Sequence, residues 1–232
     1  MNAVAYTAIC GGRDVLRHTG RARPGSEPFM CFTDVDPPCQ PYLGWDLRPA
    51  DTTIPTPRLR AKSHQIRPHL YLDADVTCYM DGTHVLKEAL TVEGLAEEFL
   101  TYTDVAVFEH SERECAYEEA EYCIEKGLDD PAVIRAQMAR YRAEGFPEGF
   151  GLPAITMMLR RRTPQVEKLS DLWWEEVQGG SVRDQLSFPY ACWRLGVKWE
   201  TIPGWAYLNK FFHYVPHGMR ASEGGFADVL PY

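Results

Sequence analysis

Apolar runs alternate with amphipathic stretches along the chain, and this alternation predicts an α/β fold. Runs typical of buried strands occupy residues 3–10, 29–34, 75–80, 104–110, 152–162 and 197–204. Helical spacing of apolar or charged positions predicts helices from 58 to about Pro68 and over 91–103, 113–127, 130–145, 169–180 and 182–196. Residues 39–57, rich in proline, aspartate and threonine, are expected to form a loop. Strands that alternate with helices indicate a sandwich around a mostly parallel sheet, in a single domain of residues 1–232.

Composition narrows the class of protein. A formal charge of -9 on 232 residues disfavours a general nucleic-acid coat, although a local basic groove stays possible. The seven cysteines include no CxxC pair, which is typical of reduced thiols, and we expect a cytoplasmic protein of bacterial or viral type. No signal-peptide pattern opens the sequence, and no apolar run reaches the roughly 18 residues of a membrane helix.

Polar residues follow several predicted strands, at the edge where ligands of parallel sheets bind. The most notable is Asp81, which ends an apolar run and precedes Gly82. Asp-Gly is a common turn pair, so one interpretation is a plain turn. The alternative is a carboxylate presented to a sugar or to Mg²⁺ or Mn²⁺, which prefer oxygen ligands. Asp73 and Asp75 precede the same strand and are expected at its opposite end, as surface residues.

Two further stretches have a structural and a functional interpretation. His110, Arg113 and Glu118 follow a predicted strand and form either a substrate-contacting loop or a capped helix start with acidic residues in its first turn. Residues 160–162 are three consecutive arginines after another strand. They are either a solvated strand end or a diphosphate contact that includes Arg161.

The last third of the chain adds candidates with the same ambiguity. Asp184 and Gln185 open a predicted helix, where a carboxylate is either a helix cap or a general base that meets an acceptor hydroxyl. His213 and His217 lie in an aromatic tail and either pack there or ligate a metal beside Asp81. Trp205 is a candidate for stacking on a sugar or a base.

Taken in order, these pieces resemble the TOD/MUCI-type glycosyltransferase-like family. The resemblance spans about residues 29–190 and rests on "FTD", "QIRPHLYL", "YMDG", "EHSEREC", "YEEAE", "MLRRR", "LWWEEV" and "RDQLSFPY". Family members commonly carry "KILPH", "WIDG", "HP-R", "YEEA", "RRH", "WW-E" and "DQLSF-Y" at the corresponding places. The tail of residues 205–232 lies outside the resemblance.

The resemblance implies a GT-A-like fold and assigns roles to this chain's residues. Asp81 takes the place of a metal-binding acidic motif. The motif positions that contact substrate correspond to His110, Arg113, Glu118 and Arg161, and the "DQ" pair corresponds to Asp184 and Gln185.

The chain also departs from the family pattern. Gln65 stands where the family has a lysine, so that any phosphate contact falls to Arg60, Lys62 or Arg67. A single aspartate replaces the Asp-x-Asp of many GT-A enzymes, which leaves metal dependence less secure than the fold.

The primary hypothesis is therefore a glycosyltransferase that moves a sugar from a nucleotide-sugar, expected to be a UDP-sugar, to a hydroxyl acceptor. The acceptor is a glycan, a metabolite or a modified (hydroxymethylated) DNA base. Asp81, Gly82 and a late histidine, His213 or His217, would hold Mn²⁺ or Mg²⁺. The donor would also be held by residues that follow the first two strands and by basic residues of the first helix, namely Ala8, Cys10, Gly11, Asp34, Arg60 and Lys62.

Two rival hypotheses belong to other classes. A non-catalytic nucleotide- or glycan-binding module of the same fold is favoured by the single aspartate and the missing lysine. A metal-dependent hydrolase is supported only by scattered aspartates and histidines. The sequence leaves the donor sugar, the acceptor, the stereochemistry and the oligomeric state open, and it indicates no membrane partner.

Overall fold

The computed structural model describes residues 1–12, 14, 16, 28–35 and 44–216. Its centre is a seven-stranded sheet in the order β3-β2-β1-β4-β7-β6-β8. Six strands run in one direction, while β7 runs antiparallel to both of its neighbours, β4 and β6. The strands are β1 (Ala3–Ile9), β2 (Phe29–Thr33), β3 (Asp46–Pro49), β4 (Val76–Met80), β6 (Val105–Glu109), β7 (Pro153–Arg161) and β8 (Glu200–Trp205).

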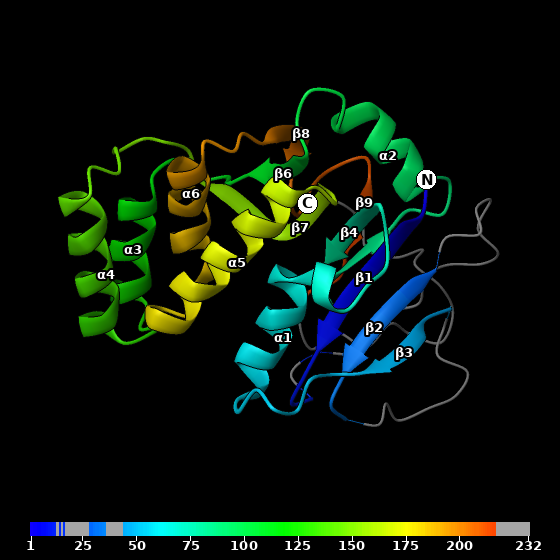
Figure 1. Ribbon diagram of the computed structural model, residues 1–232, viewed down its shortest axis with the longest axis horizontal. Coiled ribbons are helices and arrows are strands. Elements are labelled where there is room, and N and C mark those ends of the chain that lie inside the picture. The colour runs from blue at the N-terminus through cyan, green and yellow to red at the C-terminus, as the bar shows by residue number, and fades with distance from the viewer. Residues whose placement is uncertain (13, 15, 17–27, 36–43, 217–232) are drawn as a thin grey trace.

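Helices cover both faces of this sheet, and the predicted α/β sandwich with a mostly parallel sheet is confirmed (Figure 1). On one face α1 and α5 pack together and α6 packs on α5 and β7, while α2 packs on the other face. The helices α3 and α4 form an outer layer against α6. Their bounds are α1 (Pro57–Ile66), α2 (Val92–Phe99), α3 (Ala116–Glu125), α4 (Pro131–Ala143), α5 (Pro164–Gly179) and α6 (Asp184–Leu195), with a short 3₁₀ turn at Pro68–Leu70.

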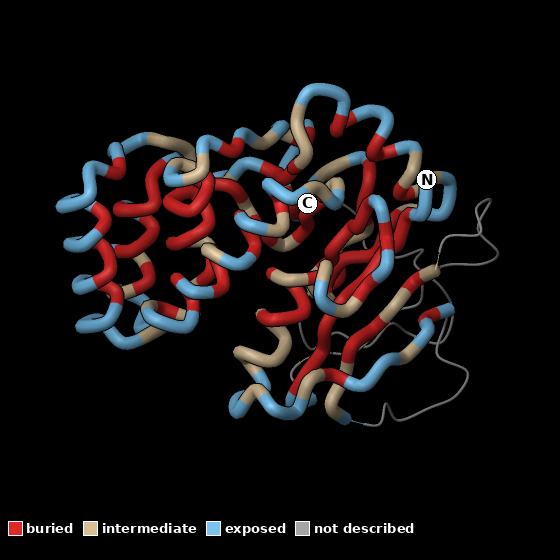
Figure 2. The backbone as a smooth tube through the Cα atoms, viewed as in Figure 1, coloured by how far each residue is buried: buried red, intermediate tan, exposed pale blue. Residues whose placement is uncertain are grey.

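The strand β1 is buried along its whole length because side chains from both of its faces enter a core (Figure 2). Val4 and Tyr6 pack in the cluster that includes Ile66 of α1 and Trp173 of α5. Ala3 and Ala5 point to the other face, which α2 covers. A strand between two helical layers therefore reads as a continuous apolar run.

The structure contains the N-cap that the sequence predicts for α2 and the helix end that it predicts for α1. Thr91 caps α2 by accepting the backbone N–H of Gly94 (3.0 Å), and α1 ends at Ile66, two residues before Pro68. Three short strands were not predicted. They are β3, which lies within the expected loop, and the two-stranded antiparallel pair β5 (His84–Leu86) and β9 (Phe212–Tyr214).

The sheet has a topological switch point between β1 and β4. From β1 the chain moves to β2 and β3 on one side, then returns to β4 on the other side of β1. Ligands of such sheets bind in the crevice beyond the carboxyl ends of the strands at this point. None of the helices in the described ranges has the length and apolar character needed to cross a bilayer.

Candidate active site

A pocket of about 690 Å³ opens at the switch point, beyond the carboxyl ends of β1 and β4 and beside the start of α1. Six of the eight residues predicted to bind the donor contribute to its lining: Ala8, Cys10, Gly11, Lys62, Asp81 and Gly82. The same lining contains residues that were not singled out as site residues from the sequence, among them Asp14, Tyr79 and Arg183. The topology thus gathers most of the predicted donor residues at one place.

Asp81 is fixed in the pocket by the end of β4. Its backbone N–H donates to the carbonyl of Thr156 on β7 (2.8 Å), and the Tyr79 hydroxyl donates to Oδ1 (2.6 Å). Desolvation raises the pKa of the Asp81 carboxyl above its usual range, against the opposing effects of Lys62 and of the Tyr79 hydrogen bond. Asp81 is therefore a positioned carboxylate that gains from any further positive charge in the pocket.

Gly82 is required by space rather than by backbone conformation. Its φ lies outside the left-handed region, but a Cβ at this position would lie 2.8 Å from Oδ2 of Asp14. Asp14 follows β1 and lines the same pocket. The Asp-Gly pair thus lets the backbone after β4 approach a second carboxylate, which the plain-turn interpretation did not include.

The donor set fits a divalent cation that shares its coordination with phosphates. Asp81 and Asp14 supply two carboxylates, and Mg²⁺ sites commonly use one or two carboxylates together with substrate phosphates and waters. Within the described ranges, no group of three or more His, Cys, Asp or Glu residues is arranged to hold a metal by itself. A cation at this pocket would therefore depend on the bound diphosphate for further ligands.

The two histidines predicted to ligate the metal, His213 and His217, are not among the described residues that line the pocket. His213 pairs with Val85 in the small sheet and does not contribute to the pocket lining, and His217 lies outside the described residues. His84 is the histidine whose charge acts on Asp81. Its two ring nitrogens already contact Thr83 Oγ1 and the carbonyl of Ala206, both at 2.9 Å.

Lys62 and Arg58 are the two basic residues of α1 that line the pocket, and Lys62 has partners there. Its ammonium donates to Asp184 Oδ2 (2.7 Å) and to Gln65 Oε1 (2.8 Å), so Gln65, in the family's lysine position, orients a lysine one helical turn earlier. Arg67 packs over the ring of Trp174, 4.6 Å from its centroid. Three residues were expected to replace the family's lysine: Arg60, Lys62 and Arg67. Of these, Lys62 lines the pocket.

Asp34 and Arg60, both predicted to bind the donor, pair with each other outside the pocket lining. Asp34 accepts the backbone N–H of Gly11 at Oδ1 (2.7 Å) and forms an ion pair with Arg60 through Oδ2. Arg60 also donates to the carbonyl of Ile54. Neither residue contributes to the pocket lining, because each satisfies the other while the pair holds the turn at Gly11 in place.

The start of α6 lies next to the pocket. Asp184 is the first helical residue rather than the N-cap, which is Arg183, and its carboxylate is held by Lys62. The side-chain amide of Gln185 donates to the carbonyl of Pro153 (2.9 Å) and so ties α6 to the start of β7. Asp184 therefore lies within the charged part of the site, and Gln185 anchors the helix that carries it.

His110 and Arg113 meet a buried acid at the carboxyl end of β6, but that acid is Glu119. Arg113 Nε donates to Glu119 Oε2 (2.6 Å), and Arg183 lies 3.8 Å from Oε1. The predicted Glu118 is exposed on α3. Desolvation lowers the pKa of His110, whose Nδ1 accepts the backbone N–H groups at 112 and 113. This cluster thus connects the loop after β6 to the start of α6.

Arg161 lies away from this pocket, so the pocket does not include the predicted diphosphate contact. Because β7 is antiparallel to β4, Arg161 pairs with Val76 at the amino end of β4. Val76 precedes Asp81 by five residues, which corresponds to about 17 Å at a strand rise of about 3.3 Å per residue. Its guanidinium contacts the carbonyl of Leu100 (3.0 Å) and the carboxylate of Asp104 (3.4 Å).

The residues missed from the sequence had weak signals of their own. Arg183 precedes the Asp184-Gln185 pair, and Asp14 follows the glycine pair that ends β1. Glu119 lies on the same face of α3 as Ala116 and Cys123, which are buried with it, so the helical phase would have selected it over Glu118.

The family profile described as "TOD1/MUCI70, glycosyltransferase-like domain" matches residues 63–205, which is more than half of the chain. No curated protein matches the sequence. Among solved structures, the apo form of mouse xyloside xylosyltransferase 1 is similar, with 10% identity and a TM-score of 0.45 over 87% of this chain and 84% of that one.

The family assignment rests on the profile match and not on the likeness to that structure. The matched segment includes Asp81, the His110 loop and the start of α6, three of the elements that border the pocket and its surroundings. The chain belongs to the TOD1/MUCI70 glycosyltransferase-like domain family.

Proposed function

We propose that the protein is a nucleotide-sugar-dependent glycosyltransferase of the GT-A type. The donor is a nucleoside diphosphate sugar, with UDP-sugars the first class to examine, and the acceptor is a hydroxyl group of a glycan, a metabolite or a modified DNA base. One observation carries the proposal. The pocket at the switch point between β1 and β4 brings Asp81, Lys62 and Arg183 together in a chain of the glycosyltransferase-like family.

The charges in the pocket suit a leaving diphosphate. Lys62, Arg58 and Arg183 line it, and cations that are already in place stabilise the negative charge that develops on a departing phosphate. When bound at Asp81 and Asp14, a divalent cation such as Mn²⁺ would supply further neutralisation of that charge. The small residues that end β1, Ala8 and Gly11, leave space for the nucleoside at the sheet edge.

Asp184 contacts or orients the acceptor in this proposal. Its carboxylate lies beside the pocket and is held by Lys62 at 2.7 Å, so one lysine links the donor side to the acceptor side. The cluster of His110, Arg113 and Glu119 supports the same helix through Arg183. These residues hold the start of α6 next to the end of β4.

The test is release of free nucleotide from a panel of nucleotide sugars, measured with Mn²⁺, with Mg²⁺ and with a chelator. Slow hydrolysis of one donor identifies the sugar and supports the proposal, and its loss in the chelator supports a cation at Asp81. Binding of the nucleotide without release from any donor, even with candidate acceptors present, would favour a binding module of the same fold. Failure to bind any nucleotide would contradict both.

A further inference from the structure

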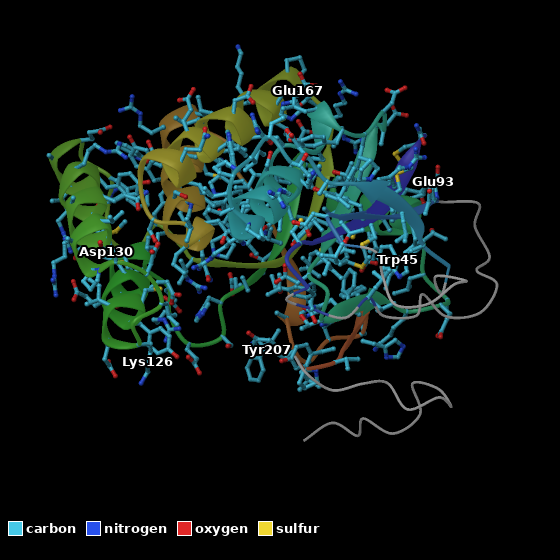
Figure 3. The ribbon with its side chains drawn as sticks, turned by 90° about the horizontal axis from the view of Figure 1, so that it is seen from below. Trp45, Glu93, Lys126, Asp130, Glu167 and Tyr207 are labelled. Atoms are coloured by element: carbon cyan, nitrogen blue, oxygen red, sulfur yellow. The ribbon has the colours of Figure 1, made fainter. Side chains whose placement is uncertain are left out.

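The turn between β8 and β9 exposes an unusual amount of apolar surface. Trp205, Tyr207 and Leu208 are 55%, 58% and 51% exposed, and these three lie within four consecutive residues. Large apolar side chains gathered on the surface of a protein commonly mark a binding site. Figure 3 shows Tyr207 at the outer edge of the molecule beside the orange strands.

This exposed turn is fixed rather than loosely attached. Trp205 and Leu208 exchange two backbone hydrogen bonds of 3.0 Å, and Asn209 donates its side-chain amide to the carbonyls of Trp205 and Ala206. Ala206 is buried, and its carbonyl contacts Nε2 of His84. An aromatic ring on a fixed turn loses little conformational entropy when a ligand stacks on it.

The turn borders the proposed site. The ring of Tyr207 packs against Tyr214 at 4.8 Å and lies 6.4 Å from the ring of His84. The backbone N–H of His84 donates to the carbonyl of Asp81 (2.8 Å). His84 therefore lies between Tyr207 and Asp81 and is close to both. Desolvation and the negative charges of Asp81 and Glu112 raise the pKa of the Tyr207 hydroxyl, which agrees with this position.

We propose that Tyr207 forms, with Trp205 beside it, a stacking platform for the sugar ring of a neutral saccharide acceptor. This inference rests on the proposed function and names the acceptor class for the same site. The apolar face of a sugar ring matches an exposed aromatic face, while Asp81 and Asp184 lie near the reacting hydroxyl. The profile match ends at residue 205, so that the family assignment does not cover Tyr207.

Charge favours a neutral saccharide over a nucleic acid. The chain carries a net charge of -9, and the charges of Asp81 and Glu112 act on the Tyr207 hydroxyl, where they raise its pKa against the opposing effect of Arg183. A phosphate backbone binds through several lysines or arginines and is repelled by carboxylates. A base that stacks on Tyr207 would bring such a backbone into this acidic surrounding.

The experiment measures saturation-transfer NMR from the protein, saturated with UDP and Mn²⁺, to methyl glycosides of glucose, galactose, mannose and xylose. The variants are Tyr207→Ala, Tyr207→Phe and the control Tyr102→Ala, whose aromatic ring is 93% exposed at the opposite end of the sheet. We expect at least one glycoside to bind the wild type. Its dissociation constant should rise about tenfold in Tyr207→Ala and stay unchanged in the other two variants.

Wild-type affinity in Tyr207→Ala overturns the inference, and so does the absence of glycoside binding to the wild-type complex with UDP. Binding of a single-stranded DNA 12-mer that Tyr207→Ala abolishes would assign the platform to nucleic acid and overturn it as well. Self-association that the same variant abolishes would assign it to a second copy of the chain, with the same consequence. If the wild type binds no nucleoside diphosphate, UDP included, the proposed function fails and takes this inference with it.

Discussion

The two ends of the central sheet use charged residues in opposite ways. At the carboxyl end, Asp81 and Lys62 line an open pocket and keep part of their charge available to a ligand. Toward the amino end, Arg160 is 2% exposed and donates to the carbonyls of Gln65 (2.6 Å) and Ile66 (3.0 Å) and to the Tyr6 hydroxyl. The first arrangement suits binding, whereas the second holds α1 onto the sheet.

This contrast shows that a charged cluster after a strand indicates function only once the direction of the strand is known. Arg160 to Arg162 form the densest basic stretch of an acidic chain, yet β7 delivers them to the end of the sheet away from the pocket. We therefore expect substitutions at the carboxyl end to change turnover and substitutions at the amino end to change stability.

The largest effect is expected for Asp81→Asn. This variant keeps the size of the side chain but removes the charge that faces the donor, and we expect turnover to fall about a thousandfold. Because the pKa of Asp81 is raised in the folded protein, its ionisation lowers stability as the pH rises above the usual carboxyl range. The variant should thus be at least as stable as the wild type at neutral pH. Nucleotide release measured beside thermal unfolding checks both statements, and wild-type turnover would contradict the role of Asp81.

The second effect concerns stability. Arg160→Ala removes the donor to the buried carbonyl of Ile66 and one of the two donors to the carbonyl of Gln65, which also accepts from the Tyr6 hydroxyl (3.0 Å). We expect a loss of about 3 kcal/mol in the free energy of unfolding. Urea unfolding measures it. A loss below about 1 kcal/mol would show that water replaces the guanidinium and that the amino end is not held as described.

The third effect is a pH dependence near the carboxyl end of β3. His64 is buried, its Nε2 accepts the backbone N–H of Asp51 (3.0 Å), and burial lowers its pKa to about 4. The unfolded chain binds this proton near pH 6.5, so stability is lost as the pH falls from about 6.5 toward 4. We expect His64→Phe to remove about 2 kcal/mol of that loss, measured as the difference in urea unfolding between pH 7 and 4.5. An unchanged difference would contradict a neutral, buried His64.

The fourth effect is on donor affinity. Lys62→Gln keeps a polar group beside Asp184 but removes the ammonium, and we expect the dissociation constant of UDP to rise about tenfold. Lys168→Gln, on the exposed side of α5, is the matched control and should leave UDP affinity unchanged. Equal affinities in both variants would remove Lys62 from the phosphate contact.

The smallest effect is expected for Arg161→Ala. Its partner Asp104 is more than a third exposed, and exposed ion pairs contribute about 0.5 kcal/mol or less to stability. Turnover and UDP affinity should match those of the wild type in parallel assays. A tenfold loss of affinity would place the diphosphate at the amino end and reverse the comparison.

The sequence predicted most of the sheet and the central acid of the site. The apolar runs of β1 and β4 and the turn that follows each depend on local pattern alone, and they placed Gly11, Asp81 and Gly82 correctly at one edge. Burial on both faces makes a parallel and an antiparallel strand look alike. The pattern of β7 therefore did not reveal its direction, which places Arg161 at the end of the sheet away from the pocket.

Other differences between the expected site and the pocket come from contacts between distant parts of the chain. Asp34 and Arg60 were both assigned to the donor because neither their ion pair nor the bond from Gly11 to Asp34 can be deduced from spacing. The choice of Glu118 over Glu119 depended on one residue of helical phase. Local pattern thus finds the edge of the sheet, whereas tertiary pairing decides which of its charges remain available.

Hydrogen exchange with and without UDP, in the presence of Mn²⁺, tests the location of the donor most directly. We expect UDP to slow amide exchange at residues 8–12 and 80–83, which border the pocket at the carboxyl ends of β1 and β4. Exchange at residues 101–104 and 160–163, at the amino end, should stay unchanged. Protection at the amino end with none at the carboxyl end would contradict the assignment of the pocket as the donor site.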